Sequence, residues 1–306
     1  MENKYAHIAV FGFNRPNHLA ACLKSLSLNP ESKKSAVTIF IDGPRAPQDL
    51  QMVEATRDVA FGEFGFLSKE VVVRETNLGL AKSITTGVNH VLADNTRIIV
   101  LEDDLWLSTS FLKFMNQGLS LYENEPRVAS LHGFCFQFAK PLDQPFFLRG
   151  ADCLGWATWK DRWETVNFNA SELLQEIESL GLSQQFNLDG AFSYTTLLKA
   201  EIGKEKHSWA ILWHASMFLQ NKLTLYPGES LIRYEGADGS GINSGTGSLW
   251  DTTFSKRDDW EFPREISESQ DARDELVNFY RVAYPKRNLF SRVIRKLIRS
   301  VMNLTK

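Results

Sequence analysis

The first hundred residues alternate short apolar, β-branched segments with amphipathic helical patterns, and this alternation is the feature that most restricts the fold. Four segments predict strands, at 7–13, 36–42, 69–75 and 97–103. The three segments between them predict helices, at 17–28, 49–60 and 80–93. Continuous apolar strands separated by helices are typical of a mostly parallel sheet covered by helices on both faces. The sequence therefore predicts an α/β protein that binds its ligands at the carboxyl ends of the strands.

The pattern loosens after residue 105. A helix is predicted at about 110–122, and short strands are predicted at 128–132 and 146–148. Glycine and small polar residues dominate 234–248, a composition that indicates a long loop. The second part of the chain is therefore expected to be less regular than the first.

Two tryptophan-rich segments, 154–163 and 207–220, have near-helical spacing and are predicted to be helical. In the first, Trp156, Trp159 and Trp163 are spaced by three and four residues, which predicts one helix face. Such a stripe packs in a core more often than it binds a ligand. We assign Trp159 and Trp163 to packing, and Trp156 is the candidate for stacking on a sugar.

The composition excludes several classes of function. The chain has 306 residues with 34 Lys and Arg against 37 Asp and Glu, and a net charge of −3 gives no general reason for nucleic-acid binding. Its three cysteines lack CxxC spacing, which favours a reducing compartment. No apolar run reaches the roughly 18 residues of a membrane span, so we expect a cytoplasmic protein without a cleaved signal. Neither GxGxxG after the first strand nor a GxxxxGK[ST] phosphate loop occurs.

Three consecutive carboxylates, Glu102, Asp103 and Asp104, follow the fourth predicted strand. They repel one another unless a positive charge lies beside them, and the motif itself contains no base. A divalent cation would meet this need, because Mg²⁺ and Mn²⁺ bind oxygen ligands and leave positions open for substrate phosphates. The alternative is a solvated acidic turn, with Ser108 capping the next helix.

Asp42 ends the second predicted strand, and Gly43 after it permits a tight turn. An acid at this position can accept hydrogen bonds from a nucleobase or a ribose hydroxyl, as acids at strand ends do in other nucleotide-binding sheets. A simple Asx-turn explains the same residues equally well.

Four segments in this order resemble the nucleotide-sugar-binding half of GT-A glycosyltransferases: IAVFGFNRPNHLAACLKSL, IFIDGP, ETNLGLAKSITTGV and IIVLEDDL. The likeness is to bacterial family 2-like enzymes and to N-acetylglucosaminyltransferase I, which also has a Glu-Asp-Asp form of the DXD motif. It covers 8–107 well and continues more thinly to about residue 241. It implies a GT-A fold with a nucleotide-sugar-binding half at 1–107, an acceptor-binding half at 108–262 and a C-terminal extension at 263–306.

The resemblance implies a metal-dependent, inverting hexosyl- or N-acetylhexosaminyltransferase that uses Mn²⁺ or Mg²⁺. Its donor would be a nucleoside-diphosphate sugar, with a UDP-sugar favoured, and its acceptor a hydroxyl of a glycan or lipid-linked glycan. A sugar nucleotidyltransferase is a rival, although it would normally carry a Gly-rich loop with Arg or Lys where this chain has GFNRPNH. A degenerate nucleotide- or carbohydrate-binding protein without transferase activity is the other alternative.

Residue roles follow from the resemblance position by position. It implies that Asp104 binds the metal directly, while Glu102 and Asp103 hold the ribose or metal-bound water. The residues implied near the donor's base, ribose and diphosphate are Asp42, Asn14, Arg15, Asn77, Gly79 and Lys82. On the acceptor side, a Gly-Trp element matches Gly155 and Trp156. Without the resemblance, residues 77–79 are also explained as a turn with a helix cap. Lys82 is then a solvated helix residue.

The chain departs from the resemblance at the catalytic base. Related enzymes carry a carboxylate just before or within the second tryptophan-containing helix, and at the expected position, two residues before Trp209, this chain has His207. His207 can act as a base because its ordinary pKa is about 6.5. Glu205 and Asp189 are alternatives, and a weak or inactive enzyme is another. The Gly-rich segment also has Asn243 where related sequences carry a histidine that contacts the metal or phosphate, with Asp238 as a substitute.

The segment from residue 285 onward contains seven Lys or Arg residues and no acid, with apolar residues at helical spacing. A basic amphipathic helix of this kind can lie on an anionic membrane surface. The alternative is a helix that packs its apolar face on the protein body or a partner chain. We therefore expect peripheral association with the inner face of the cytoplasmic membrane.

Overall fold

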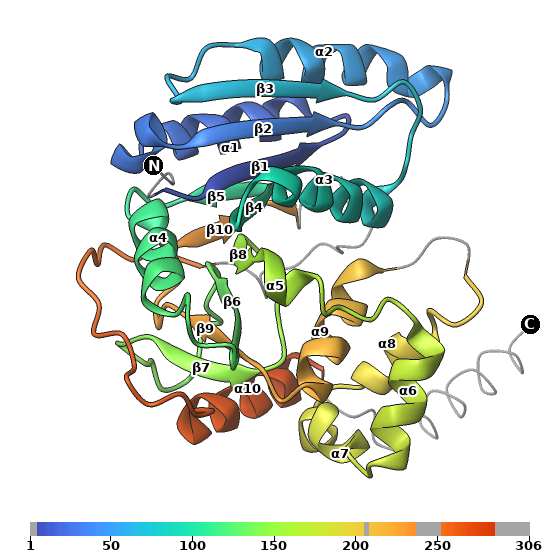
Figure 1. The fold of residues 1–306 in the computed structure, drawn as a ribbon, viewed down its shortest axis with the longest axis vertical. Helices are drawn as coiled ribbons and strands as arrows, with labels where there is room; N and C mark the ends of the chain where they lie inside the picture. Colours follow the sequence, from blue (N-terminus) through green and yellow to red (C-terminus); the bar gives the residue numbers. More distant parts are fainter. Residues whose placement is uncertain (1–4, 205–207, 237–251, 285–306) are drawn as a thin grey trace, which may run out of the picture.

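The computed structural model describes residues 5–204, 208–236 and 252–284. An eight-stranded sheet crosses the molecule in the order β3-β2-β1-β4-β8-β6-β9-β7 (Figure 1). Its strands are β1 (His7–Gly12), β2 (Ala36–Ile41), β3 (Ser68–Val73), β4 (Arg97–Glu102), β6 (Val128–His132), β7 (Phe146–Arg149), β8 (Trp156–Trp159) and β9 (Leu223–Tyr226). Within the described residues, six of these strands run in one direction, and β8 and β7 run antiparallel to them. The predicted mostly parallel α/β sheet is confirmed.

Helices cover both faces of this sheet, as predicted. They are α1 (Pro16–Ser27), α2 (Leu50–Phe61), α3 (Leu80–Asp94), α4 (Phe111–Leu121), α5 (Lys160–Trp163), α6 (Ala170–Ser179), α7 (Ser183–Phe186), α8 (Tyr194–Lys199), α9 (Trp209–Leu219) and α10 (Gln270–Ala283). Three short 3₁₀ turns are η1 (Pro30–Lys34), η2 (Pro47–Asp49) and η3 (Leu188–Gly190). Alternate residues of β1 face opposite layers: Ile8 and Val10 pack with α1, whereas Ala9 and Phe11 pack with α3 and α9.

The seven elements predicted in the first hundred residues are all present, β1 to β4 with α1 to α3 between them. Strands β1, β2 and β4 form because their Val and Ile side chains are buried on both faces of the sheet, whereas β3 lies at its edge and is more exposed. Pro16 begins α1, a position where its fixed φ suits the helix and its missing N–H costs nothing. The predicted helix near 110–122 and strand at 128–132 are α4 and β6.

The prediction of a helix over 154–163 is wrong, because Trp156–Trp159 is strand β8, inserted between β4 and β6. In a strand, residues three apart lie on opposite faces. Trp156 accordingly packs with Trp209 and Trp213 on one face, and Trp159 joins the core on the other. Only Trp163, on the short helix α5, returns to the face of Trp156. The assignment of Trp159 and Trp163 to packing is confirmed by their burial.

Two features bring distant parts of the chain to the carboxyl end of β4. Because β8 is antiparallel to β4, its first residue, Trp156, lies opposite Val100 near the end of that strand. A separate two-stranded ribbon joins β5 (Leu105–Leu107) to β10 (Ile232–Tyr234) directly after the acids. The pairing of β4 with β8 also joins the two predicted halves in one sheet.

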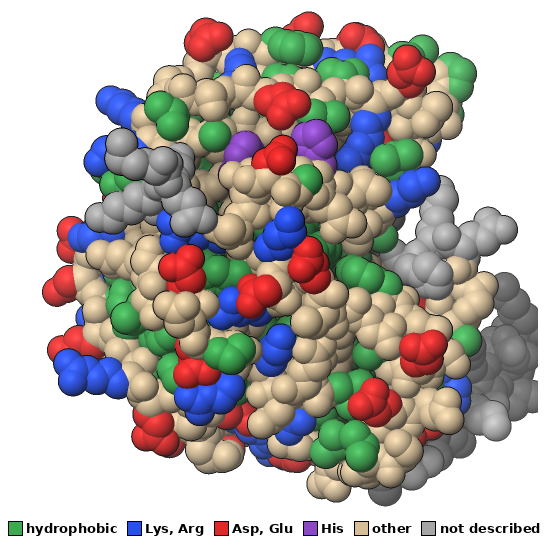
Figure 2. All heavy atoms as spheres, viewed as in Figure 1, with side chains coloured by type: hydrophobic (Ala, Val, Ile, Leu, Met, Phe, Trp, Pro, Cys, Tyr) green, Lys and Arg blue, Asp and Glu red, His purple; other side chains and the backbone are tan. Residues whose placement is uncertain are grey.

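The surface shown in Figure 2 carries acidic and basic side chains interspersed, as expected for a net charge of −3. Helix α10, from the predicted C-terminal extension, packs on the sheet near β7 through Leu276 and Tyr280. In the part of the chain that the structure describes, no helix has both the length and the apolar character needed to cross a bilayer. The predicted basic segment from 285 onward lies outside the described residues.

Candidate functional site

The acidic segment lies at the carboxyl end of β4, and Arg15 from the loop after β1 supplies its positive charge. The Nη2 atom of Arg15 donates to the carboxylates of both Asp103 and Asp104, with 3.0 Å to Asp104. Its Nε atom donates to Asp103 at 3.3 Å. One guanidinium therefore bridges two adjacent carboxylates, both of which are almost fully buried. The sequence motif contains no base, but the fold provides one.

Backbone bonds hold the acids in this position. The amide of Asp103 donates to the carbonyl of Phe11 at 2.9 Å, which extends the pairing of β4 with β1. The amide of Glu235 donates to the carbonyl of Asp104 at 2.9 Å. A Cβ atom on Gly236 would lie 2.6 Å from a carboxylate oxygen of Asp104, so Gly236 lies directly against this acid. The end of β10 thus covers the acids, and residues 237–251, with Asp238 and Asn243, follow outside the described residues.

One arginine does not compensate three carboxylates at this depth. Burial, together with the charges of Asp104 and Asp103, raises the pKa of Glu102 to about 8, although Arg15 opposes this shift. Burial also raises the pKa of Asp103 to about 6, although Arg15 opposes this shift. The pKa of Arg15 is raised by the same two aspartates in spite of its own burial. Arg15 alone therefore does not balance the negative charge of the three acids.

The donor set fits a divalent cation. Mg²⁺ and Mn²⁺ prefer oxygen ligands and are commonly held by one or two carboxylates together with substrate phosphates. Asp103 and Asp104 offer two such side chains in adjacent positions, and the excess negative charge suits a cation. Among the described residues, no group of three or more His, Cys, Asp or Glu side chains is arranged to hold a metal ion by itself. Asp103 and Asp104 would therefore hold the ion together with donor phosphates.

Asp42 organises the backbone of the loop before α3. Its carboxylate accepts hydrogen bonds from the amides of Gly43 at 3.1 Å, Leu78 at 2.9 Å and Gly79 at 3.0 Å. The side chain is buried, and its charge lies at the N-terminus of α3, where a negative charge is favourable. These bonds match the turn-forming role that the sequence offered as the alternative, and they join the loop after β2 to the loop before α3. A contact of Asp42 with the nucleobase stays a prediction.

The other donor-side residues gather on the same edge. Asn77 donates from its side-chain amide to the carbonyl of Gly43 at 2.9 Å, which ties the loop after β3 to the loop after β2. Gly79 has a φ of +76°, the left-handed region that favours glycine, and α3 begins directly after it. Lys82 is exposed on the first turn of α3. Asn14 donates to Asp49 at 3.4 Å, linking the loop after β1 to η2.

Gly43→Ala is expected to lower the free energy of unfolding by about 2 kcal/mol through overpacking. A Cβ atom there would lie 2.5 Å from the backbone carbon of Thr76, so the two loops would have to separate. Urea denaturation measures the change. Gly65→Ala is the matched control, since Gly65 has a positive φ but open space, and backbone strain alone should cost it about 1 kcal/mol. Wild-type stability of Gly43→Ala would show that this contact is not tight.

The acceptor-side residues lie where β8 begins. The carbonyl of Gly155 accepts from the amide of Gly133 at 2.7 Å. Trp156 is 1% exposed, and its ring packs in the core against Trp163, Trp209 and Trp213. The pKa of the Cys153 thiol is raised well above its usual range, first by burial and then by Glu102 and Asp152, which places this segment beside the acids. The acceptor-binding role of Gly155 and Trp156 stays a prediction.

Of the three candidate bases, only Asp189 lies in the described residues. Its carboxylate accepts a hydrogen bond from Arg273 of α10 at 2.7 Å, and this bond lowers its pKa. A carboxylate held by an arginine is a weak proton acceptor, so the structure does not favour Asp189 as the base. Glu205 and His207 lie outside the described residues.

A polar group that the sequence did not reveal lies close to the acceptor side. Asp152 accepts a hydrogen bond from the hydroxyl of Tyr226 at 2.7 Å. His214 contacts the carbonyl of Ala151 at 2.9 Å. These partners are more than sixty residues apart in the chain. No local spacing could have predicted them, because they meet only through the packing of β9 and α9 against the segment before β8.

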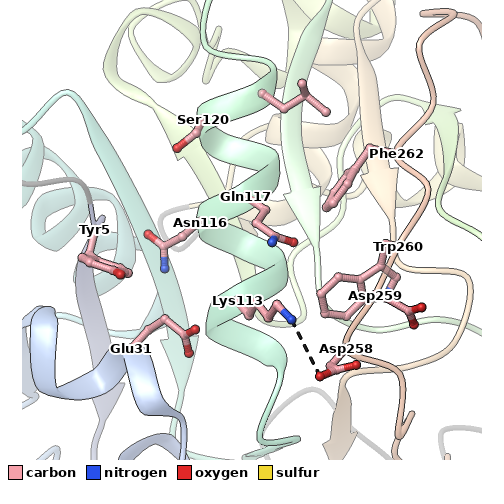
Figure 3. Close-up of a pocket in the computed structure, with 11 residues that line it drawn as sticks. Tyr5, Glu31, Lys113, Asn116, Gln117, Ser120, Asp258, Asp259, Trp260 and Phe262 are labelled. Carbon is pink, nitrogen blue, oxygen red and sulfur yellow. Dashed lines mark ion pairs between the residues drawn. The ribbon is translucent and has the colours of Figure 1, made fainter.

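A hollow of about 810 Å³ lies along α4, away from the acids (Figure 3). Figure 3 shows Trp260 and Asp259 on one side of α4 and Tyr5 and Glu31 on the other. Tyr5 comes just before β1, so this hollow lies at the amino end of that strand, opposite the acids. It is therefore not the site that Asp103 and Asp104 form.

Several solved structures resemble this chain distantly. No protein-family model matches the chain. Residues 1–349 of S. aureus TarS are 14% identical, and the match covers 74% of this chain and 59% of that chain with a TM-score of 0.41. The mannosyltransferase PcManGT from Pyrobaculum calidifontis, in complex with GDP-Man and Mn²⁺, is 12% identical over 71% of each chain with a TM-score of 0.36. A UDP-glucose pyrophosphorylase complexed with UDP-glucose is 12% identical, over 72% of this chain and 90% of that chain, with a TM-score of 0.35.

The chain thus spans less than two thirds of the TarS structure. At these identities and TM-scores, the role of each residue rests on the geometry of the site itself. The likeness to N-acetylglucosaminyltransferase I stays a prediction. The sheet, with antiparallel β8 beside β4, is the mostly parallel arrangement with helices on both faces that the sequence predicted.

Proposed function

We propose that this protein is a metal-dependent, inverting glycosyltransferase that moves a sugar from a nucleoside-diphosphate sugar, with UDP-sugar favoured, to a hydroxyl of a glycan or lipid-linked glycan. The observation that carries this proposal is the buried acidic cluster at the carboxyl end of β4. One arginine contacts two of its three carboxylates, those of Asp103 and Asp104, and ligands of such sheets bind at this edge. Asp42 and the start of α3 lie at the ends of neighbouring strands, where a nucleotide would lie.

Each group of residues has a part in the proposed reaction. Asp104 would ligate Mn²⁺ or Mg²⁺, with Asp103 and Glu102 near the metal-bound water and the ribose. The bound ion supplies charge that stabilises the departing nucleoside diphosphate. Asn14, Asn77 and Lys82 would line the nucleotide.

A base must take the proton from the acceptor hydroxyl as that oxygen attacks the anomeric carbon. His207 is the first candidate and Glu205 the second, both proposed from the sequence. Gly155 marks the side on which the acceptor would enter, beside the start of β8.

One observation favours a second candidate function. Arg15 contacts both carboxylate oxygens of Asp103 and one of the two of Asp104, the acids that would bind the metal. A nucleotide- or carbohydrate-binding protein that has lost its transferase activity could keep such a stable internal ion pair. In that case the acids would serve the stability of the fold rather than catalysis.

Hydrolysis of a panel of nucleotide sugars, measured by release of the nucleoside diphosphate, tests the proposed function. We expect release from one donor with Mn²⁺ and loss of that release with EDTA, since water can replace the acceptor. A matched panel without protein gives the background. Equal rates with Mn²⁺ and EDTA would contradict the metal requirement, and no release from any donor would favour the binding protein.

Peripheral membrane association and an anionic membrane surface as partner remain part of the proposal. They rest on the basic sequence from residue 285 onward, which lies outside the described residues. A cytoplasmic location at the inner face of the cytoplasmic membrane is proposed on the same ground.

A further inference from the structure

We infer that Arg15 is an exchangeable counterion: its guanidinium occupies the carboxylates of Asp103 and Asp104 when no metal is bound, and a divalent cation must displace it. This inference rests on the proposed function. It adds that binding of the metal and binding of the nucleoside diphosphate are coupled through one side chain.

The contacts of Arg15 show that the two cations compete for the same atoms. Arg15 Nη2 contacts one oxygen of Asp103 and one of Asp104, and Nε contacts the second oxygen of Asp103. A divalent ion bound by these two carboxylates at about 2.1 Å would lie next to the guanidinium, because Arg15 already contacts three of their four oxygens. A guanidinium and a dication on shared oxygens would repel each other strongly in a site with so little water. One must leave when the other binds.

Arg15 is placed to move, whereas the acids are not. It lies in the short loop between β1 and α1, and its side chain is 18% exposed, against 3% for Asp103. Its Nη1 atom is buried without a hydrogen-bond partner. The acids, in contrast, are fixed by the backbone bonds of Asp103 to Phe11 and of Asp104 to Glu235. The exchange therefore changes the position of the arginine and leaves the carboxylates in place.

A displaced guanidinium needs another anion, and a nucleoside diphosphate supplies one at this edge. Arginine binds phosphate oxygens through paired N–H donors. A diphosphate beside the acids would accept Arg15 and bridge the metal at the same time. Each ligand then makes the binding of the other easier, and by linkage the two coupling factors are equal.

Titration of Mn²⁺, followed by electron paramagnetic resonance of the free ion, tests the exchange without measuring activity. Arg15→Met removes the competing charge but keeps a side chain of similar length. We expect this variant to bind Mn²⁺ about tenfold more tightly than wild type in the absence of nucleotide, within the usual range of coupling. Saturating UDP, or GDP in a second series, should tighten Mn²⁺ binding of wild type by a larger factor than that of the variant, because phosphate oxygens ligate the ion in both but displace Arg15 only in wild type.

Arg45→Met is the matched control. Arg45 lies in the next loop, where it contacts the ring of Phe13 and forms an exposed ion pair with Asp49. Its replacement should leave Mn²⁺ binding at the wild-type level. If Arg15→Met fails the check of folding by near-ultraviolet circular dichroism, Arg15→Gln takes its place. Glutamine also removes the competing positive charge but keeps N–H donors for the buried carboxylates, so its Mn²⁺ affinity should still exceed that of wild type.

Two outcomes would overturn the inference, and they differ in what else they affect. If the Arg15 variant binds Mn²⁺ no more tightly than wild type, while UDP tightens binding in both, the exchange is wrong and the proposed function stands. If neither protein binds Mn²⁺ with or without UDP or GDP, the exchange and the metal dependence of the proposed function both fail.

Discussion

Asp104→Asn is expected to lower metal-dependent donor turnover by at least about 100-fold while the protein stays folded. A metal ion contributes several kcal/mol of charge stabilisation in a reaction of this kind, and about 1.36 kcal/mol corresponds to a factor of ten in rate. Asparagine keeps the shape of the side chain but removes the charge that would bind the ion. The measurement is the rate of nucleoside diphosphate release at saturating Mn²⁺, with the best donor from the hydrolysis panel.

Two features make this substitution a test of catalysis rather than of folding. Arg15 keeps its bonds to Asp103, including the one from Nε at 3.3 Å, so no buried charge is left without a partner. Asp258→Asn is the matched control, because Asp258 is an exposed acid beside α4, 3.7 Å from Lys113. It should retain full turnover. Unchanged turnover in Asp104→Asn would show that Asp104 does not bind the metal.

Asp42→Ala is expected to lower the free energy of unfolding by about 3 kcal/mol, because several bonds to a charged acceptor would be lost at once. The amides of Gly43, Leu78 and Gly79 would lose their partner inside the loop region before α3. Urea denaturation gives the change. An unchanged m-value would show that the variant and the wild type expose the same amount of surface on unfolding.

A control separates this role from a general effect of removing an acid. Asp58 is exposed on α2, and Asp58→Ala should change stability by less than about 0.5 kcal/mol. Asp42→Asn keeps one acceptor oxygen and should lie between Asp42→Ala and wild type. Should Asp42→Ala prove as stable as wild type yet bind no donor, the carboxylate would be a nucleobase ligand rather than an organiser of the loops.

The sequence predicted the first half of the fold well because its strands are buried on both faces. Such strands read as continuous apolar runs, and β1, β2 and β4 each consist mainly of Val, Ile and Phe or Leu. The apolar residues of the intervening helices recur with a helical period that is equally clear. Each element in this region could therefore be located from local pattern alone.

The second half was harder to predict because its pattern depends on partners far away in the chain. Trp156 and Trp159 suit a helix by spacing, but the strands β4 and β6 on either side supply hydrogen bonds that favour a strand. The ribbon of β5 with β10 joins segments more than one hundred residues apart. Three-residue strands of this kind carry too little local signal to be found in advance.

The candidate site was predicted in its location but not in its contacts. The acids, Asp42 and the start of α3 do lie at the carboxyl ends of neighbouring strands, as parallel topology requires. The charge opposite Asp103 was missed, because Arg15 lies 88 residues earlier and was assigned to the nucleotide instead. The bonds of Asp42 to Leu78 and Gly79 were likewise hidden, since they form only when the loops after β2 and β3 meet.

The central claim is that this edge of the sheet binds a nucleotide sugar together with a divalent cation. Isothermal titration of a panel of UDP-, GDP- and other nucleotide sugars into the protein, with Mn²⁺ and with EDTA, tests it most directly. We predict that one donor binds with Mn²⁺ and that its binding falls at least tenfold with EDTA. Binding of that donor with equal affinity in both conditions, or of no donor in either, would contradict the claim.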